Sequence, residues 1–390
     1  MFRIGKEEID AVARVIESKK LFRVNDSSNE VNNFEKEWAE KIGVKYTVCM
    51  SGGTGAIISA LVGLGIGPGD EVIVPAYTFI STALAVLAVG AIPVIADIDG
   101  SLTIDPDDIE RKISPYTKAI LPVHMVGIPC NMDKIMDLAK NYNLKVVEDA
   151  CQADGGSYKG KRLGAIGDAG AFSFNFYKII TAGEGGAVVT NNRRVYERIA
   201  IYHDVGLPFW NYVGSISEPL FIGSQFRASE ITGAIMREQL KRLDGILEDL
   251  RKVKRQFVEK LSSMPKINFA RSNDPEGDCA STLAFSFPNE ASARKFAKSE
   301  GVGGWLPIDS DRHVYINWDP ILNKQGAHHP ALNPYNLPEN KKLNMNYSKD
   351  MCKKTLEILS TTVFLSLNPD WSTEEVEYRI NSCSKAAAGL

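Results

Sequence analysis

The sequence lacks the patterns that mark secreted, membrane-spanning and metal-binding proteins. No apolar run approaches the roughly 20 residues that a membrane-spanning helix needs, and residues 4–20 form an amphipathic, charged segment instead of a signal peptide with an apolar centre. The six cysteines form no CxxC pair, and the five histidines show no HxxxH or HExxH spacing. We therefore expect a cytoplasmic protein with reduced thiols, no contact with a membrane and no metal site.

An excess of charge of one sign is also missing. The net charge is -3 over 390 residues, and 44% of the residues are hydrophobic. A chain without a strongly basic balance offers no broad positive surface to nucleic acid, whereas this apolar fraction is typical of a globular protein with a large core. We expect small molecules, and not nucleic acid, as its ligands.

Helical and strand patterns alternate through the first two-thirds of the chain. The expected strands are short, continuous Val/Ile runs, which indicate burial on both faces and hence a mostly parallel sheet covered by helices. Strands are predicted at 46–50, 71–75, 92–97, 119–123, 145–148, 169–175 and 187–190, and helices at 30–42, 54–64, 79–89, 106–113 and 132–141.

The last third has a different organisation. A long helical pattern over about 228–264 precedes an α+β region, with a strand at 283–287 and helices at 292–300, 351–359 and 373–387. Residues 317–346 are rich in Pro, Asn and Gly and are predicted to form a long loop. We therefore expect an α/β protein in which residues 1–240 form a large domain and residues 241–390 form a linking helix and a small α+β domain.

The segment 146–190 combines three groups that one cofactor requires. Asp149 follows an apolar strand, Ser173 lies between two phenylalanines, and Lys178 follows among mostly apolar neighbours. A carboxylate for the pyridine nitrogen, a hydroxyl for the phosphate and an amine for a Schiff base are what pyridoxal 5'-phosphate needs. Each residue also has an ordinary interpretation, because Asp149 could cap a helix and Lys178 could be a solvated surface lysine.

Two further groups fit the same cofactor. Residues 51–56 (SGGTGA) follow a strand and open a helix, where backbone N–H groups and the helix dipole favour a phosphate. Phe79 follows the next strand and could stack on a flat ring. An ordinary tight turn and a core aromatic residue are the alternatives for these two features.

Taken together, these residues resemble the DegT/DnrJ/EryC1/StrS family of sugar aminotransferases, which has the aspartate-aminotransferase fold (fold type I) with a mixed, mostly parallel sheet. The resemblance extends from residue 4 to the C-terminal helix, and the order and separation of its motifs are specific. The motifs are 67–75 (GPGDEVIVP), 105–109 (DPDDI), 148–152 (EDACQ), 164–168 (GAIGD) and 181–186 (TAGEGG).

The resemblance implies a role for each site residue. Lys178 would form the Schiff base and move the proton, Asp149 would pair the pyridine nitrogen, and Gln152 and Phe79 would flank the ring. Gly53, Thr54 and Ser173 would hold the phosphate. Because the dehydratase branch of the family has histidine in place of the lysine, Lys178 implies transamination.

The resemblance also implies the reaction and the assembly. Glutamate or glutamine would leave its amino group on the cofactor as pyridoxamine 5'-phosphate, which then aminates a keto- or aldehydo-sugar. A homodimer with shared active sites is implied, in which an amide reaches the phosphate of the neighbouring subunit. The family commonly has asparagine at that position, and this chain has Gln225, within 223–227 (GSQFR).

The small domain departs more from the family pattern. Residues 305–309 (WLPID) and 312–318 (RHVYINW) are predicted to face the substrate, with His313 and Tyr315 as candidate contacts. Their layout is similar to a branch that includes an enzyme aminating the eight-carbon acidic sugar ketodeoxyoctulosonate; nucleotide-linked and antibiotic amino sugars are the other expected products. His313 could bind a substrate hydroxyl or carboxylate, or be a structural histidine.

Two other functions stay open on the sequence alone. The chain could be another pyridoxal enzyme of the same fold that acts on amino acids, although such a transaminase usually needs an arginine clamp for the carboxylate. It could also be a regulator that binds sugar or cofactor without turnover.

Overall fold

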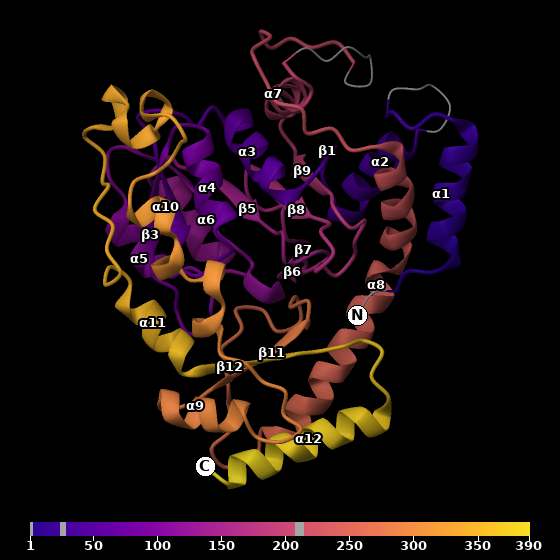
Figure 1. Ribbon diagram of the computed structural model, residues 1–390, viewed down its shortest axis with the longest axis vertical. Coiled ribbons are helices and arrows are strands. Elements are labelled where there is room, and N and C mark those ends of the chain that lie inside the picture. Colours follow the sequence, from indigo (N-terminus) through magenta and orange to yellow (C-terminus); the bar gives the residue numbers. More distant parts are fainter. Residues whose placement is uncertain (1–2, 24–28, 207–213) are drawn as a thin grey trace.

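The computed structural model describes residues 3–23, 29–206 and 214–390. Its centre is a seven-stranded sheet with the order β1-β9-β8-β5-β4-β2-β3 (Figure 1). β9 runs antiparallel to β1 and β8, and the remaining neighbours pair in parallel. The strands are β1 (Tyr46–Met50), β2 (Glu71–Pro75), β3 (Ile92–Ala96), β4 (Thr117–Ile120), β5 (Lys145–Asp149), β8 (Ala169–Ser173) and β9 (Gly186–Thr190). This sheet confirms the mostly parallel mixed architecture.

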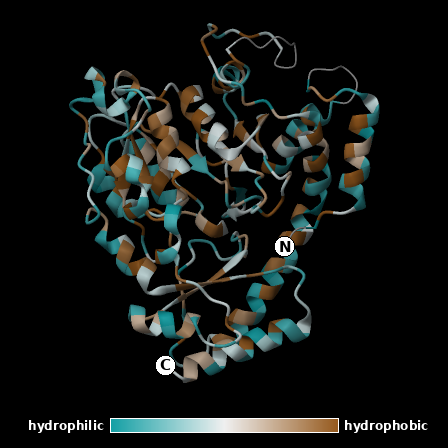
Figure 2. Cartoon of the chain, in the orientation of Figure 1, coloured by the Kyte–Doolittle hydropathy of each residue, from teal (hydrophilic) through white to brown (hydrophobic). Residues whose placement is uncertain are grey.

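Burial explains why these segments form strands. Every residue of β2, β3, β8 and β9 is buried, as expected for Val/Ile runs covered on both faces. Figure 2 shows hydrophobic residues gathered in the sheet and its flanking helices and hydrophilic residues along the outer loops. The helices around the sheet are α3 (Gly53–Leu64), α4 (Ser81–Ala88), α5 (Pro106–Lys112), α6 (Met132–Asn141) and α7 (Arg193–His203).

A long helix, α8 (Glu230–Leu261), connects the two parts of the molecule (Figure 1). Its first half packs beside α1 (Lys6–Ser18) and α2 (Glu30–Ile42), where Arg237 pairs with Glu37. Its second half contacts α12 (Thr373–Ala388). The predicted division at residue 240 falls inside this continuous helix and stays a prediction.

The second part of the molecule is built on a three-stranded antiparallel sheet with the order β10-β11-β12. Its strands are β10 (Asn268–Phe269), β11 (Thr282–Ser286) and β12 (Thr362–Ser366), and α9 (Glu290–Ala297) and α12 cover it. β12 and α7 are absent from the predicted set. β12 follows α11 (Lys353–Ser360) almost directly, so the sequence has no stretch of turn residues that would mark the start of this strand.

The predicted long loop at 317–346 is a chain of short helical turns, including α10 (Asp319–Leu322). It lies against the edge of the large sheet. Asn340 Nδ2 donates to Gly90 O at 2.9 Å, and Tyr347 OH donates to Pro93 O at 2.8 Å. Within the described ranges, no helix has the length and apolar character that crossing a membrane requires.

Candidate active site

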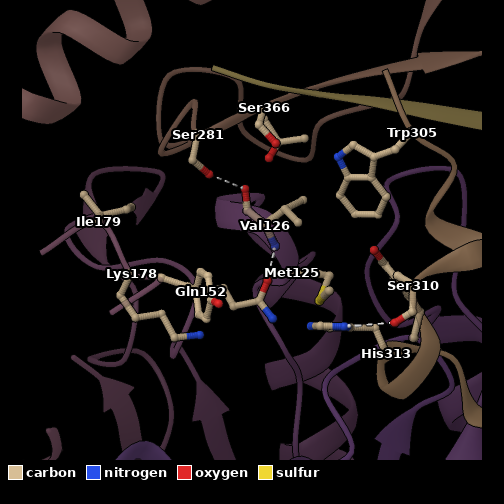
Figure 3. A pocket seen from close by; sticks show the side chains of 13 residues that line it. Met125, Val126, Gln152, Lys178, Ile179, Ser281, Trp305, Ser310, His313 and Ser366 are labelled. Atoms are coloured by element: carbon tan, nitrogen blue, oxygen red, sulfur yellow. Dashed lines mark hydrogen bonds between the residues drawn. The ribbon is translucent and has the colours of Figure 1, made fainter. Parts of the chain in front are cut away.

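A cavity of about 290 Å³ lies where the carboxyl ends of the large sheet's strands face the small sheet (Figure 3). Open α/β sheets place their ligands at this edge. The large part contributes Tyr77, Met125, Val126, Gln152, Tyr177, Lys178 and Ile179. The chain after α8 contributes Ser281, Thr282, Trp305, Ser310, His313 and Ser366.

Lys178 reaches this cavity from the turn after β8. Its backbone N–H donates to Asn175 O at 2.9 Å, and Figure 3 shows its amine beside Gln152. The lysine is half-buried. Its neighbours Phe176 and Tyr177 are exposed, at 49% and 79%, and do not enclose it. The shelter that the sequence predicts for the amine is therefore only partial in this chain.

Asp149 ends β5 and is buried. Its Oδ2 accepts a hydrogen bond from Thr82 Oγ1 at 2.8 Å, and its Oδ1 accepts one from the Cys151 N–H at 3.1 Å. In the described part of the chain, no lysine or arginine forms an ion pair with Asp149. The two hydrogen bonds thus hold the carboxylate in place. A protonated pyridine ring would supply the cation that balances its charge.

The turn at the start of α3 lies directly against Ser173. A Cβ added to Gly53 would stand 2.7 Å from Ser173 Cβ and 3.0 Å from Cys151 Sγ, so only glycine permits this approach. Thr54 Oγ1 donates to Ser81 Oγ at 3.0 Å. No side chain caps this helix N-terminus, so its first N–H groups and the nearby hydroxyls form a cradle that fits a phosphate.

Gln152 is oriented by a strained backbone segment. Its Oε1 accepts a hydrogen bond from the Val126 N–H at 3.1 Å, and Val126 O accepts one from Ser281 Oγ at 3.0 Å (Figure 3). Val126 has φ 49° and ψ 29°, a left-handed conformation that is rare for a β-branched residue. Because Oε1 is engaged, the amide N–H groups of Gln152 remain for a ligand in the cavity.

Phe79 packs against His313, which lines the cavity on the side opposite Lys178 (Figure 3). Phe79 is 39% exposed, and its ring lies 5.3 Å from the His313 ring at an angle of 53°. Exposure of this kind is what a stacking platform needs, and it is unusual for a core aromatic residue. His313 is half-buried, and burial first, then the charge of Lys178, hold the pKa of its imidazole below the usual value.

Of the predicted site residues, Gln152, Lys178 and His313 line the cavity itself. Two others, Tyr315 and Gln225, are engaged elsewhere in the fold. Tyr315 is fully buried, and its hydroxyl donates to Lys349 O at 2.5 Å while accepting from the Cys352 N–H at 3.2 Å. That Tyr315 contacts the substrate stays a prediction, and in this structure its hydroxyl is occupied by two backbone groups. Gln225 is exposed and pairs through its backbone with Asp204, so it does not reach the cavity of its own chain.

Several cavity residues have no sequence signal that could have identified them. Ser281 and Ser366 belong to the small sheet's edge, and Val126 acts through its backbone. Trp305, in contrast, belongs to the predicted substrate-facing segment 305–309, and it lies in the cavity wall. Near this site, Asp154 is a further buried acid whose two oxygens have no hydrogen-bond partner among the residues that the structure describes, and burial raises the pKa of its carboxyl well above the usual range.

Comparison with known proteins gives curated relatives that match 59% to 63% of this chain. The chain is 38% identical over 250 residues to a GDP-perosamine synthase of Escherichia coli O157:H7, covering 63% of this chain and 66% of that protein. It is 41% identical over 233 residues to a GDP-perosamine synthase of Caulobacter vibrioides, covering 59% of this chain and 62% of that protein. The matches therefore span just under two-thirds of the length of these relatives.

Solved structures resemble this chain over almost its whole length. The 3-amino-5-hydroxybenzoic acid synthase superposes with a TM-score of 0.81 at 26% identity, covering 100% of this chain and 98% of that chain. NtdA of Bacillus subtilis, solved with bound cofactor PMP, superposes with a TM-score of 0.78 at 26% identity, covering 99% and 83%. The sequence model of one family matches residues 3–300. The chain belongs to the DegT/DnrJ/EryC1/StrS aminotransferase family.

Proposed function

We propose that this protein is a pyridoxal phosphate-dependent aminotransferase that moves an amino group from glutamate or glutamine to a keto- or aldehydo-sugar. The observation that carries the proposal is the convergence of the Lys178 side chain, the buried Asp149 carboxylate and the Gly53–Ser173 cradle at one edge of the sheet. Family membership supports the same reaction.

The groups present suit this cofactor. Gly53, Thr54 and Ser173 would hold its phosphate, Asp149 would face its ring nitrogen, and Gln152 and Phe79 would lie on either side of its ring. Bound there, the cofactor supplies the aldehyde that takes up the donor's amino group and returns it to the acceptor.

Lys178 would have two tasks in this site. Its Nζ would hold the cofactor covalently between turnovers. During turnover the released amine would take the proton from the reacting carbon and return it at the neighbouring position. Proton transfer of this kind requires an unprotonated amine, so we expect activity to fall as the pH becomes acidic.

Two features support a sugar as acceptor in preference to a small α-keto acid. Among the described residues that line the cavity, none is an arginine, so this lining does not include the clamp that α-keto-acid transaminases use. The wall built by the small part carries serine and threonine hydroxyls, an imidazole and the Trp305 indole. Hydroxyls that exchange hydrogen bonds and an exposed aromatic face suit a polyhydroxylated ring.

Stopped-flow absorbance tests the proposal in two steps. Glutamate added to the protein with pyridoxal phosphate should convert the cofactor to its amine form, and a suitable keto-sugar should convert it back. A panel of GDP- and dTDP-linked keto-sugars, an eight-carbon sugar acid with a terminal aldehyde, and simple α-keto acids would identify the acceptor. Turnover with α-keto acids alone would contradict the sugar assignment, and a cofactor that never changes form would identify a regulator.

We further propose that the protein acts as a homodimer with shared sites. Large apolar side chains are exposed near the turn at residues 51–56. Ile222 is 92% exposed, and the exposed Phe22 ring lies against Arg227. The carbonyl of the neighbouring residue Phe226 accepts a hydrogen bond from the Ser51 N–H, which links this surface to the turn. An apolar surface of this kind needs a partner. A second copy would also supply groups for the donor's carboxylates and would place Gln225 at the neighbouring phosphate.

Subunit complementation tests the shared site. Lys178→Ala and Gln225→Ala homodimers should each be impaired, but mixed dimers contain one site with neither substitution. Mixing the two variants under conditions of subunit exchange should therefore restore activity, up to about a quarter of the wild-type value if subunits assort randomly. No recovery despite demonstrated exchange would place Gln225 in its own subunit's site or outside any site.

A further inference from the structure

The hydrogen bonds around His313 fix which ring nitrogen carries the proton. Nδ1 lies 3.3 Å from Ser310 O, and a carbonyl oxygen can only accept, so Nδ1 carries the hydrogen in this contact. Nε2 of the neutral ring then has a free lone pair. Figure 3 shows the ring edge-on, with the nitrogen remote from Ser310 directed into the cavity towards the wall that carries Gln152 and Lys178.

Contacts with the large part hold the ring in this direction. The Thr78 N–H donates to His313 O and the Ile80 N–H donates to Arg312 O, both at 3.0 Å. The ring itself lies against Phe79. The imidazole is therefore positioned by the same segment that would support the cofactor ring, and an acceptor group stands at a fixed place beside the reacting centre.

The surroundings of His313 keep the ring neutral. Burial lowers the pKa of the imidazole most strongly, the hydrogen bond to Ser310 O opposes this shift, Lys178 lowers the pKa further, and Asp311 in the same turn raises it least. From the facing strand end, Tyr77 contributes a phenol whose pKa burial raises, so the phenol is also uncharged. A neutral imidazole offers no positive charge to a carboxylate, whereas its lone pair accepts a hydrogen bond from a hydroxyl.

We propose that His313 recognises the acceptor sugar: Nε2 accepts a hydrogen bond from a hydroxyl close to the carbonyl carbon that receives the amino group. This inference rests on the proposed function. It selects the hydroxyl over the carboxylate as the group that His313 recognises, and it makes His313 a specificity-determining residue for the second half of the reaction.

Two substitutions separate this role from a structural one. His313→Phe keeps a ring against Phe79 but removes the acceptor, and His313→Gln keeps an oxygen near the position of Nε2. For His313→Phe we expect kcat/KM of the sugar half-reaction to fall about 10- to 100-fold, while the glutamate half-reaction changes less than about 2-fold. His313→Gln should recover most of the loss, and calorimetric Kd values for the aminated sugar should follow the same order.

The pH dependence gives an independent readout. In the wild type, kcat/KM for the sugar should fall as the pH drops through the lowered pKa of His313, below the ordinary value of about 6.5, because the protonated ring can no longer accept. The difference between wild type and His313→Gln should disappear or reverse under acidic conditions. Equal losses in both half-reactions, or wild-type sugar kinetics in His313→Phe, would overturn the inference, whereas a wild type that converts no sugar would contradict the proposed function itself.

Discussion

The two walls of the cavity differ in how they are built and in what they present. The wall at the strand ends carries Gln152 and Lys178, and Asp149 at the end of β5 is fixed by hydrogen bonds from Thr82 and Cys151. The opposite wall carries neutral groups, among them Trp305, Ser310 and His313, from the chain after α8. On the proposed function, the groups that would perform the chemistry and the neutral groups that would select the substrate thus lie on different parts of the molecule. Substitutions on the two walls should therefore give different kinetic signatures.

The largest expected effect is on the strand-end wall. Lys178→Ala should reduce turnover on the order of 10⁴-fold, because the proton at the reacting carbon loses its acceptor. The fold should persist, since a half-buried lysine contributes little to the core. Turnover and the unfolding temperature measured on the same preparation check this, and full activity in Lys178→Ala would remove the lysine from the mechanism.

A pair of buried acids gives the next test. Asp149→Asn should lower kcat about 10- to 100-fold and weaken cofactor binding, because a charge-assisted hydrogen bond becomes a neutral one. Asp154→Asn is the matched control: Asp154 is also buried and near Lys178, but burial raises the pKa of its carboxyl and so favours the neutral form. The control should change kcat less than about 3-fold. Equal losses in the two variants would show that burial, and not charge, matters at Asp149.

On the opposite wall, Trp305→Ala should raise KM for the sugar about 5- to 10-fold with little change in the glutamate half-reaction. Trp371→Ala is the control, because Trp371 packs against Arg379 and Phe257 in the small part. This control should lower the unfolding temperature and leave KM for the sugar unchanged. A rise in KM in both variants would indicate a loosened small part instead of a lost contact.

The smallest effect is expected at Tyr315, which the sequence placed on the substrate side. Tyr315→Phe should cost about 1 to 2 kcal/mol of stability, because Lys349 O and the Cys352 N–H lose a buried partner. Chemical denaturation measures this loss, and KM for the sugar should stay within about 2-fold of wild type. A large change in KM without a change in stability would indicate that Tyr315 contacts the substrate.

The strand-end wall was predictable because its groups follow one another along the chain. Asp149, Ser173 and Lys178 belong to one segment in which apolar strands end, so strand periodicity brings them to one edge of the sheet. Gln152, in contrast, was predicted only through the family resemblance. The large sheet was predictable for the same reason, since each of its strands is a local apolar run.

The opposite wall depends on packing between distant segments. Ser281 and Ser366 meet at one end of the β11–β12 pair, where Thr282 pairs with Ser366, and His313 is placed by a bridge between Tyr77 and Val314. No local pattern encodes these meetings. The strain at Val126 could not be predicted from the sequence either, because a valine rarely adopts a positive φ.

Reduction of the holoenzyme with borohydride, followed by peptide mass spectrometry, tests the central claim most directly. Reduction makes the link between an amine and the cofactor permanent. We predict a single modified peptide, with the cofactor's mass on Lys178, and no modification after prior conversion with glutamate. Modification of a different lysine, or no adduct on protein saturated with pyridoxal phosphate, would contradict the account.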